Sequence, residues 1–178
     1  MNTLEIDTLL KKHPHSRPVF KGVYARLLNV PSALVGNTDP DHRMGQHWVA
    51  IYINANSKGE YYDSTGRPPL LRAYVNFMKK HCHCWTYNTV RVQEEGSIVC
   101  GHHCIFYLIH RCVGHSMTDV TRLLENPVEA TTIVQNLFCY FLNMCYEKKR
   151  LMQPLYIEPV TSLNKCRVTF YWVIKCTI

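Results

Sequence analysis

Cys100 is the residue of this chain best placed to act as a nucleophile. It is followed directly by Gly101 and opens an apolar segment, residues 100–113, that is too long for a typical strand and ends at Gly114. The segment is predicted to be a buried helix, and backbone N–H groups at a helix N-terminus favour a thiolate and lower its pKa. The glycine beside it would let a substrate backbone approach closely. A cysteine in an apolar run is nevertheless more often a small core residue, so Cys100 alone decides nothing.

A nucleophilic thiol needs a nearby base, and the base needs a third group that fixes its orientation. His47 begins a run of β-branched and aromatic residues, 47–54, and Asp63 lies near the end of a second run, 60–64. The turn residues 56–59 separate the two runs, which are predicted to be the strands of one antiparallel hairpin. Such a hairpin would bring His47 and Asp63 to neighbouring positions, against which the start of the cysteine's helix can pack. Taken singly, each is more often a strand-end residue, but together the three predict a triad.

Two further residues concern the same chemistry. Gln93 lies seven residues before Cys100, and its amide can donate to an oxyanion alongside the backbone N–H of the cysteine. Cys104 is the competing nucleophile, but it lies one turn inside the predicted helix and lacks a following glycine. We therefore expect Cys104 to face the core.

Histidine and cysteine also cluster at residues 81–84, which read His-Cys-His-Cys. Cys82 and Cys84 can be combined with Cys100 and Cys104 into a zinc site, because zinc is often bound by paired ligands two to four residues apart. Yet the first pair directly follows a predicted helix, and the second coincides with the candidate nucleophile. No metal site is predicted, and a structural zinc is the rival interpretation of these residues.

Other segments supply the remaining elements of an α+β domain. Predicted helices cover residues 3–12, the segment that begins at Pro68-Pro69, residues 118–125 and residues 128–146. Extended segments are predicted at 19–28, 86–93 and 167–178, and a turn at 37–41. The domain is predicted to span residues 1–146. Residues 147–178 form a tail that is either an added strand, an activating segment or an extension outside the fold.

The composition limits the class of protein. The 178 residues suffice for one well-buried domain, and 47% apolar with 19% charged residues is typical of a globular protein. No apolar run approaches the roughly 20 residues of a membrane-spanning helix, and no secretory signal is evident. We therefore expect an intracellular chain with nine reduced cysteines and no membrane partner. The net charge of +7 fits a nucleic-acid partner or, equally, solubility alone.

Three segments carry a resemblance to a known family, and they read GQHWVAIYI (45–53), YYDSTGRPP (61–69) and QEEGSIVCGHHCIFYLIH (93–110). With FKGVYARLLNVP (20–31) and ALVGNTDPDHRMGQHW (33–48), they resemble the adenovirus protease (adenain) group. The likeness is closest to the proteases of Polinton/Maverick elements and adenovirus-like viruses, and it covers about residues 19–146. The wider clan includes the SUMO- and ubiquitin-like-protein proteases, which share the order His, Asp, Gln, Cys. The adenoviral enzymes have Glu in the acid position, whereas Asp63 resembles the SUMO-protease and Polinton forms.

The resemblance implies a papain-like thiol-protease fold. It also implies the chain order His, Asp, Cys and a small, mostly antiparallel sheet packed against a central helix that carries the nucleophile. The implied roles are His47 as general base, Asp63 as its orienting group, Gln93 as oxyanion donor, Cys100 as nucleophile, and Trp48 with Gly101 lining a narrow substrate channel.

The activity implied by the resemblance is that of a cysteine endopeptidase. Its expected substrates are viral or transposon-encoded capsid and core precursors, cut after glycine in Gly-Gly or Gly-Ala-like sites. The chemistry needs no cofactor, while double-stranded DNA and an activating peptide are candidate stimulators. A monomer acting in the host nucleus or the virion is expected. Two alternatives stay open: a deubiquitinase or SUMO-like-protein protease, and a catalytically inactive, DNA-associated virion protein.

Overall fold

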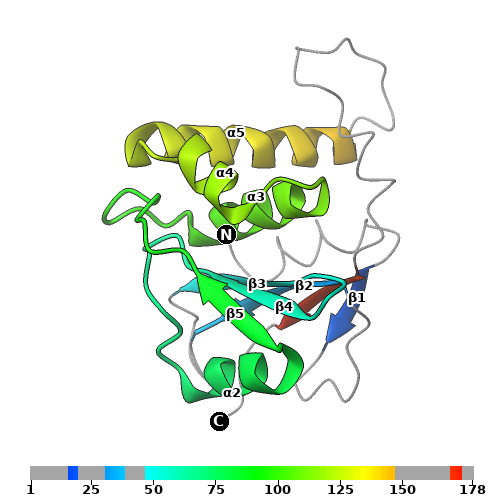
Figure 1. Cartoon of the computed structure of the whole chain (residues 1–178). Coiled ribbons are helices and arrows are strands. Elements are labelled where there is room, and N and C mark those ends of the chain that lie inside the picture. Colours follow the sequence, from blue (N-terminus) through cyan, green and yellow to red (C-terminus); the bar gives the residue numbers. More distant parts are fainter. Residues whose placement is uncertain (1–15, 20–30, 39–46, 147–168, 174–178) are drawn as a thin grey trace.

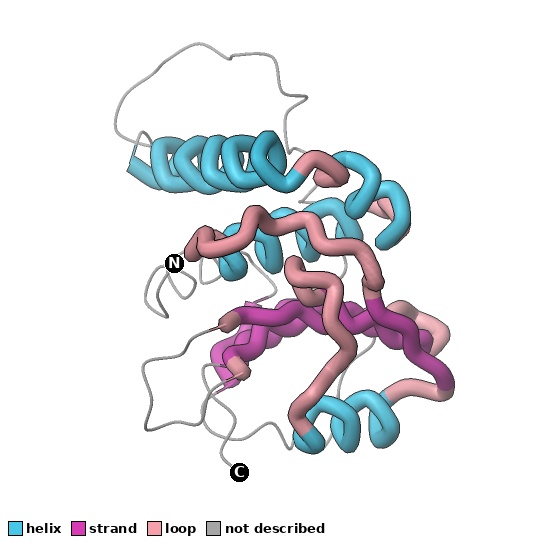
Figure 2. Tube along the Cα trace, turned by 90° about the vertical axis from the view of Figure 1, so that its left-hand side faces the viewer, coloured by secondary structure: helices cyan, strands magenta, loops and turns pink. Residues whose placement is uncertain are grey.

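The computed structural model describes four stretches of the chain, residues 16–19, 31–38, 47–146 and 169–173. Within them, a six-stranded sheet lies between three helices on one face and a fourth helix on the other (Figure 1). Figure 2 shows the same layers after a quarter turn. The α+β class expected from the sequence is confirmed.

The sheet is mixed. Its strands are β1 (Ser16–Val19), β2 (Ser32–Asn37), β3 (Trp48–Ile53), β4 (Lys58–Tyr62), β5 (Cys84–Tyr87) and β6 (Thr169–Val173). Their order in space is β1-β6-β2-β3-β4-β5. β3 pairs antiparallel with β2 and β4, whereas β6 runs parallel to β1 and β2, and β5 parallel to β4. The expectation of a mostly antiparallel sheet is therefore wrong, because β5 returns through a helical crossover and β6 inserts from the C-terminal part of the chain.

β3 and β4 form the hairpin that the sequence predicts, with Ala50 paired to Tyr62. Asn54 closes the turn. Its backbone N–H donates to the Lys58 carbonyl at 3.0 Å, and its side-chain oxygen accepts from the N–H groups of Asn56 and Lys58. The turn therefore satisfies its own backbone groups and fixes the register of the two strands.

Two apolar clusters hold the helices to the sheet. The helices are α2 (Arg72–His81), α3 (Cys100–Cys112), α4 (Met117–Leu123) and α5 (Pro127–Tyr146). α2 packs Tyr74, Phe77 and Met78 against one face of the sheet, and α3 packs against the other. Each fully buried side chain of this size contributes roughly 1.5–3 kcal/mol. The predicted helices at 100–113, 118–125 and 128–146 are confirmed to within two residues, while the one expected from Pro68-Pro69 begins only at Arg72.

An ion pair between Arg111 and Glu60 joins α3 to β4. Arg111 binds the carboxylate of Glu60 through Nε at 2.6 Å and through a second nitrogen at 3.0 Å, and the Tyr107 hydroxyl donates to the same carboxylate. The guanidinium of Arg111 lies 4.6 Å from the centroid of the Tyr52 ring, and Tyr107 stacks on Tyr62. Paired hydrogen bonds between two charged groups have a defined geometry, so this ion pair fixes the position of α3 over the hairpin.

Two predictions about strands are corrected. β2 was not expected from the sequence, and the strand expected at 86–93 is instead the shorter β5, which ends at Tyr87. Residues after Tyr87 leave the ladder because the Asn88 side chain bonds the chain beyond β4. β6 lies within the segment 167–178 that was expected to be extended.

Several predictions concern residues that the structure does not describe. The predicted helix at 3–12, the extended segment after Val19 and most of the turn at 37–41 lie outside the described residues. Among the described helices, none is both long and apolar enough to cross a bilayer.

Candidate active site

The open end of the β3–β4 hairpin holds the candidate base and carboxylate. His47 directly precedes β3, and Asp63 directly follows β4. The pairing of Ala50 with Tyr62 brings both to the same end of the hairpin, where His47 Nε2 lies 2.8 Å from Asp63 Oδ1. The sequence pattern of two strands and a turn was therefore sufficient to predict this contact.

Asp63 is held as a buried anion. It is 5% exposed, and its Oδ1 accepts hydrogen bonds from His47 and from both the backbone N–H (2.8 Å) and the hydroxyl (2.7 Å) of Thr65. Burial raises the pKa of a carboxyl, but here the hydrogen bonds and the His47 charge outweigh it and lower the pKa of Asp63. Because an ionised carboxylate only accepts, His47 donates from Nε2 and is left with Nδ1 for another partner.

Cys100 is that partner. It is the first residue of α3, 7% exposed, and its thiol hydrogen-bonds the His47 imidazole. The backbone N–H groups of Trp48 and Gly101 also hydrogen-bond the sulfur. One imidazole therefore bridges a buried carboxylate and a thiol, and the thiol lies at the positive end of a helix.

The pKa shifts of His47 and Cys100 both favour an ion pair between the two side chains. Burial lowers the pKa of His47, but its bonds to Asp63 and Cys100 more than compensate and raise it to about 9. Burial likewise raises the pKa of Cys100, but the hydrogen bond to His47 and the backbone N–H groups lower it on balance. Both shifts therefore favour a thiolate beside an imidazolium, which is the state of a reactive cysteine.

Gln93 lies in the loop between β5 and α3, and it is 6% exposed. Its Oε1 accepts from the Ser64 hydroxyl at 2.6 Å, and its Nε2 donates to the Ser97 carbonyl at 2.8 Å. Ser64 directly follows Asp63, and Ser97 is three residues before Cys100. The structure therefore ties Gln93 to the segments that carry both of these residues.

Ser64, Thr65 and Asn88 were not singled out from the sequence. Asn88 is 4% exposed, and its amide accepts from the Asp63 N–H at 2.9 Å and donates to the Asp63 carbonyl at 2.7 Å. The strand predicted over residues 60–64 ends at Tyr62 in the structure, and residues 63–65 form a turn beyond it. Nothing local, however, indicates that Asn88 and Gln93 reach back to it across 25 and 29 residues.

Trp48 and Gly101 were expected to line a substrate channel, and the structure buries both. Trp48 is 5% exposed and belongs to the same apolar cluster as Val99 and Cys100. Gly101 is buried in the first turn of α3. Both contribute a backbone N–H beside the Cys100 sulfur.

Cys104 lies in the core, as expected. It is fully buried, and burial together with the charges of Cys100 and Asp63 raises the pKa of its thiol well above the usual value. A neutral thiol in such surroundings is a poor nucleophile.

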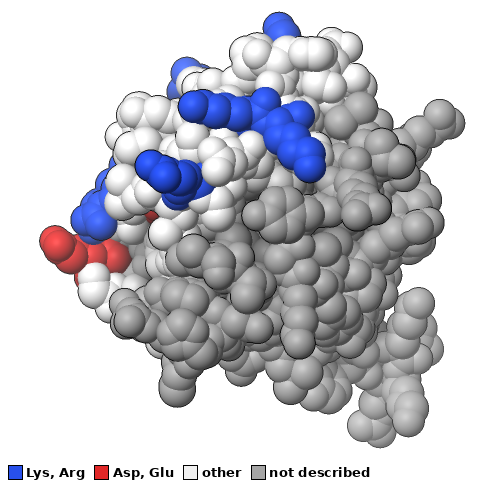
Figure 3. Space-filling view, turned by 90° about the horizontal axis from the view of Figure 1, so that it is seen from below, with Lys and Arg blue, Asp and Glu red and all other residues white. Residues whose placement is uncertain are grey.

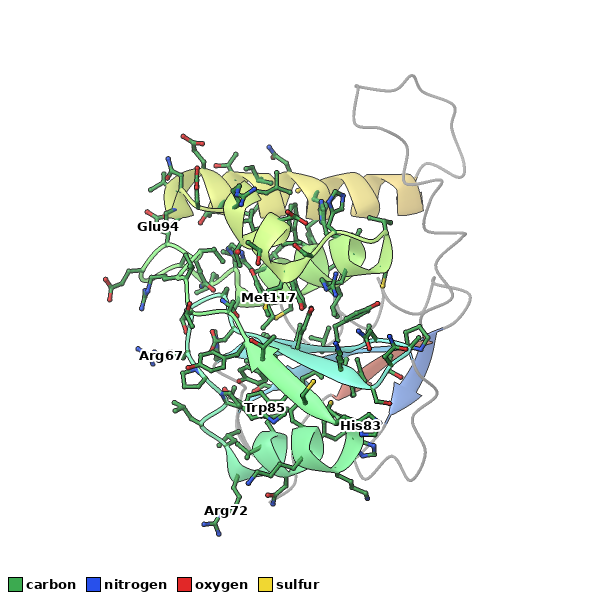
Figure 4. All side chains as sticks on the ribbon, in the orientation of Figure 1. Arg67, Arg72, His83, Trp85, Glu94 and Met117 are labelled. Carbon is green, nitrogen blue, oxygen red and sulfur yellow. The ribbon has the colours of Figure 1, made fainter. Side chains whose placement is uncertain are left out.

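The two pairs that the rival zinc interpretation would combine lie at opposite ends of the hairpin. Cys84 pairs with Lys58 next to the turn, whereas Cys100 lies with His47 at the open end. In Figure 4, His83 lies at the start of β5 and Glu94 in the loop beyond the other end of that strand. Within residues 16–19, 31–38, 47–146 and 169–173, no three His, Cys, Asp or Glu side chains are grouped to hold a metal.

No protein-family model and no curated protein matches the chain. Among solved structures, the fold is similar to the central domain of the uncharacterized Lpg1148 protein from Legionella pneumophila, with a TM-score of 0.50 and 13% sequence identity. The similarity covers 80% of this chain and 98% of that one. At this identity the similarity concerns the fold alone.

Proposed function

We propose that the chain is a cysteine endopeptidase of the adenovirus-protease type, with a papain-like fold and the catalytic order His47, Asp63, Cys100. The observation that carries the proposal is the His47 imidazole, which bonds the buried Asp63 carboxylate on one side and the Cys100 thiol at the start of α3 on the other. Nucleophile, base and orienting group within hydrogen-bond reach are the geometric requirement for acyl transfer through a thiol.

The acylation step follows from this geometry. The Cys100 thiolate attacks the substrate carbonyl carbon, a C–S bond forms, and the carbonyl electrons move to the oxygen. Gln93 Nε2 and the Cys100 backbone N–H stabilise this oxyanion. As the oxyanion collapses, the C–N bond breaks and the Nδ1–H of His47 protonates the leaving amine.

In deacylation His47 acts as the base, and Cys100 is the leaving group. Neutral His47 takes a proton from water, whose oxygen attacks the thioester carbonyl, and the thiolate leaves with its electron pair. The acid product departs, and His47 is again protonated beside the thiolate. Asp63 stays ionised throughout; it orients the ring and stabilises its positive form.

The resemblance supports substrates of one class, viral or transposon-encoded capsid and core precursors cut after glycine, in the host nucleus or the virion. The surface supports DNA as a stimulator. α2 contains no acidic residue and exposes Arg72, Lys79 and Lys80. Seen from the α2 side, Lys and Arg side chains stand at several places on the described surface, and acidic side chains lie at one edge of it (Figure 3).

The deciding experiment incubates wild-type protein and Cys100→Ala with candidate precursors encoded beside this gene, and sequences the new termini. We expect cleavage after glycine by the wild type alone, and preferential iodoacetamide labelling of Cys100 over the exposed Cys84. Cleavage of ubiquitin-tail fusions but not of precursors would favour the deubiquitinase alternative. No cleavage, with Cys100 labelled no faster than Cys84, would rule out the protease.

A further inference from the structure

The orientation of the Gln93 amide is fixed by two partners. The Ser97 carbonyl can only accept, so the amide must present Nε2 to it. The Ser64 hydroxyl then donates to Oε1 at the other end. A flipped amide would set Oε1 against the Ser97 carbonyl oxygen, which leaves two acceptors facing each other.

Ser64 is fully buried and contacts Gln93 in two independent ways. Its hydroxyl bonds the side chain, while its carbonyl accepts from the backbone N–H groups of Val92 (2.9 Å) and Gln93 (3.0 Å). Removing the hydroxyl leaves both backbone bonds in place. The Ser64 side chain can therefore be tested separately from the course of the loop.

We propose that Ser64 is a positioning residue for the oxyanion site, a role that rests on the proposed protease function. Nε2 carries two hydrogens, and Ser97 takes one of them. By holding Oε1, the Ser64 hydroxyl prevents the amide from rotating and aims the second N–H. Because Ser64 is the residue after Asp63, one turn then orients the base through Asp63 and the oxyanion donor through Ser64.

Without the hydroxyl, Oε1 is a buried acceptor with no partner, and the amide loses its fixed orientation. Formation of the oxyanion should suffer, whereas the His47–Cys100 pair should keep its reactivity, because the hydrogen bonds of Ser64 go to Gln93 and Val92. Three readouts separate these effects. They are turnover of a peptidyl-Gly-Gly-aminomethylcoumarin, inhibition by a peptidyl-Gly-Gly aldehyde whose adduct places an oxygen in the oxyanion position, and alkylation of Cys100 by iodoacetamide, which forms no oxyanion.

Ser64→Ala should lower kcat/KM by at least roughly tenfold and weaken aldehyde inhibition by a similar factor, with the alkylation rate unchanged within about twofold. Gln93→Ala should lose roughly 10²–10³ in turnover. The double variant should be no worse than Gln93→Ala, because the hydroxyl acts through the amide. Thr121→Ala, which removes a hydroxyl bonded to a helix carbonyl in α4, is the matched control and should leave all three readouts unchanged.

An equal loss of turnover and alkylation in Ser64→Ala, or losses that multiply in the double variant, would overturn the proposal in favour of a purely structural hydroxyl. If the alanine variant does not fold, Ser64→Cys supplies a weaker donor of similar size and should give an intermediate loss of turnover per alkylatable Cys100; an undiminished value would overturn the proposal as well. A wild-type protein that neither cleaves the peptide nor reacts preferentially at Cys100 would instead overturn the protease function itself.

Discussion

At the scale of single residues, two of the three cysteines of α3, Cys100 and Cys104, lie one helical turn apart in different surroundings. Burial raises the pKa of both thiols, but at Cys100 the bonds to His47 and to backbone N–H groups reverse the shift. We expect Cys100→Ala to abolish turnover and alkylation. Cys104→Ala should preserve the alkylation rate and lower the free energy of unfolding by roughly 1 kcal/mol through a small cavity. Peptide mapping after iodoacetamide, together with urea unfolding, measures both effects.

The opposite ranking of these two variants would move the nucleophile to Cys104. It would also show that helix-end position and the contact with His47 are not what makes a thiol reactive here. The exposed Cys84 in the same protein serves as an internal reference.

The pH dependence of kcat/KM should be bell-shaped. Activity appears as pH rises through the pKa of Cys100, which is lowered, and it disappears as pH rises through about 9, where His47 loses the proton that the leaving amine needs. Asp63→Asn removes the carboxylate that helps to raise the pKa of His47, so the alkaline limb should move to lower pH. The exposed Asp119→Asn is the control and should not move it. An alkaline limb that ignores Asp63→Asn would contradict the bridged triad.

At the scale of elements, the parts that could be predicted are those whose signals are local. The hairpin β3–β4 follows from two apolar runs and a turn, and α3 follows from an apolar segment with a glycine behind it. Both bring site residues together within a few residues of a strand or helix end, so His47, Asp63 and Cys100 could be predicted from the sequence.

Pairings between distant segments could not be predicted in this way. β2 and β6 are neighbours in the sheet, yet their residues are more than a hundred positions apart in the chain. The end of β5 was also missed, because it depends on a contact of Asn88 with Asp63 that no local pattern encodes. The same limit explains why Ser64 and Asn88 emerged only from the structure.

Asn88 links the ends of β4 and β5, and its removal should act on the site through Asp63. Asn88→Ala leaves the buried N–H and carbonyl of Asp63 without this partner, which should cost about 1–3 kcal/mol of stability. Once variants are compared well below their melting temperature, the alkylation rate of Cys100 should also fall, because the carboxylate that orients His47 is less firmly held. Urea unfolding and alkylation kinetics measure the two effects. Thr86→Ala, an exposed change on β5 itself, is the control and should alter neither stability nor alkylation. If Asn88→Ala lowers stability without changing Cys100 reactivity, the role of Asn88 is structural only.

At the scale of the whole molecule, the candidate site and the basic surface lie on different layers. Cys100 begins α3 on one face of the sheet, and α2 covers the other face (Figure 1). A polyanion bound along α2 would therefore leave the start of α3 accessible. The chain has 20 Lys and Arg against 13 Asp and Glu, so long-range attraction favours such binding.

We expect weak, sequence-independent binding of double-stranded DNA, accompanied by faster precursor cleavage, because sliding along phosphates speeds the search for scattered substrates. The affinity of binding driven by counterion release falls linearly with salt concentration on logarithmic axes.

Lys79→Ala with Lys80→Ala should reduce the slope of that line by roughly 2, about one per lost phosphate contact. Arg122→Ala, an exposed cation of α4 on the other side of the sheet, should leave the slope unchanged if α2 is the binding surface. Anisotropy titrations with labelled DNA at several salt concentrations test the binding, and a cleavage assay run beside them tests the faster cleavage. Binding that is absent at low salt, or a slope that Arg122→Ala reduces as much as the lysine pair does, would leave α2 as a solvated face with no part in DNA recognition.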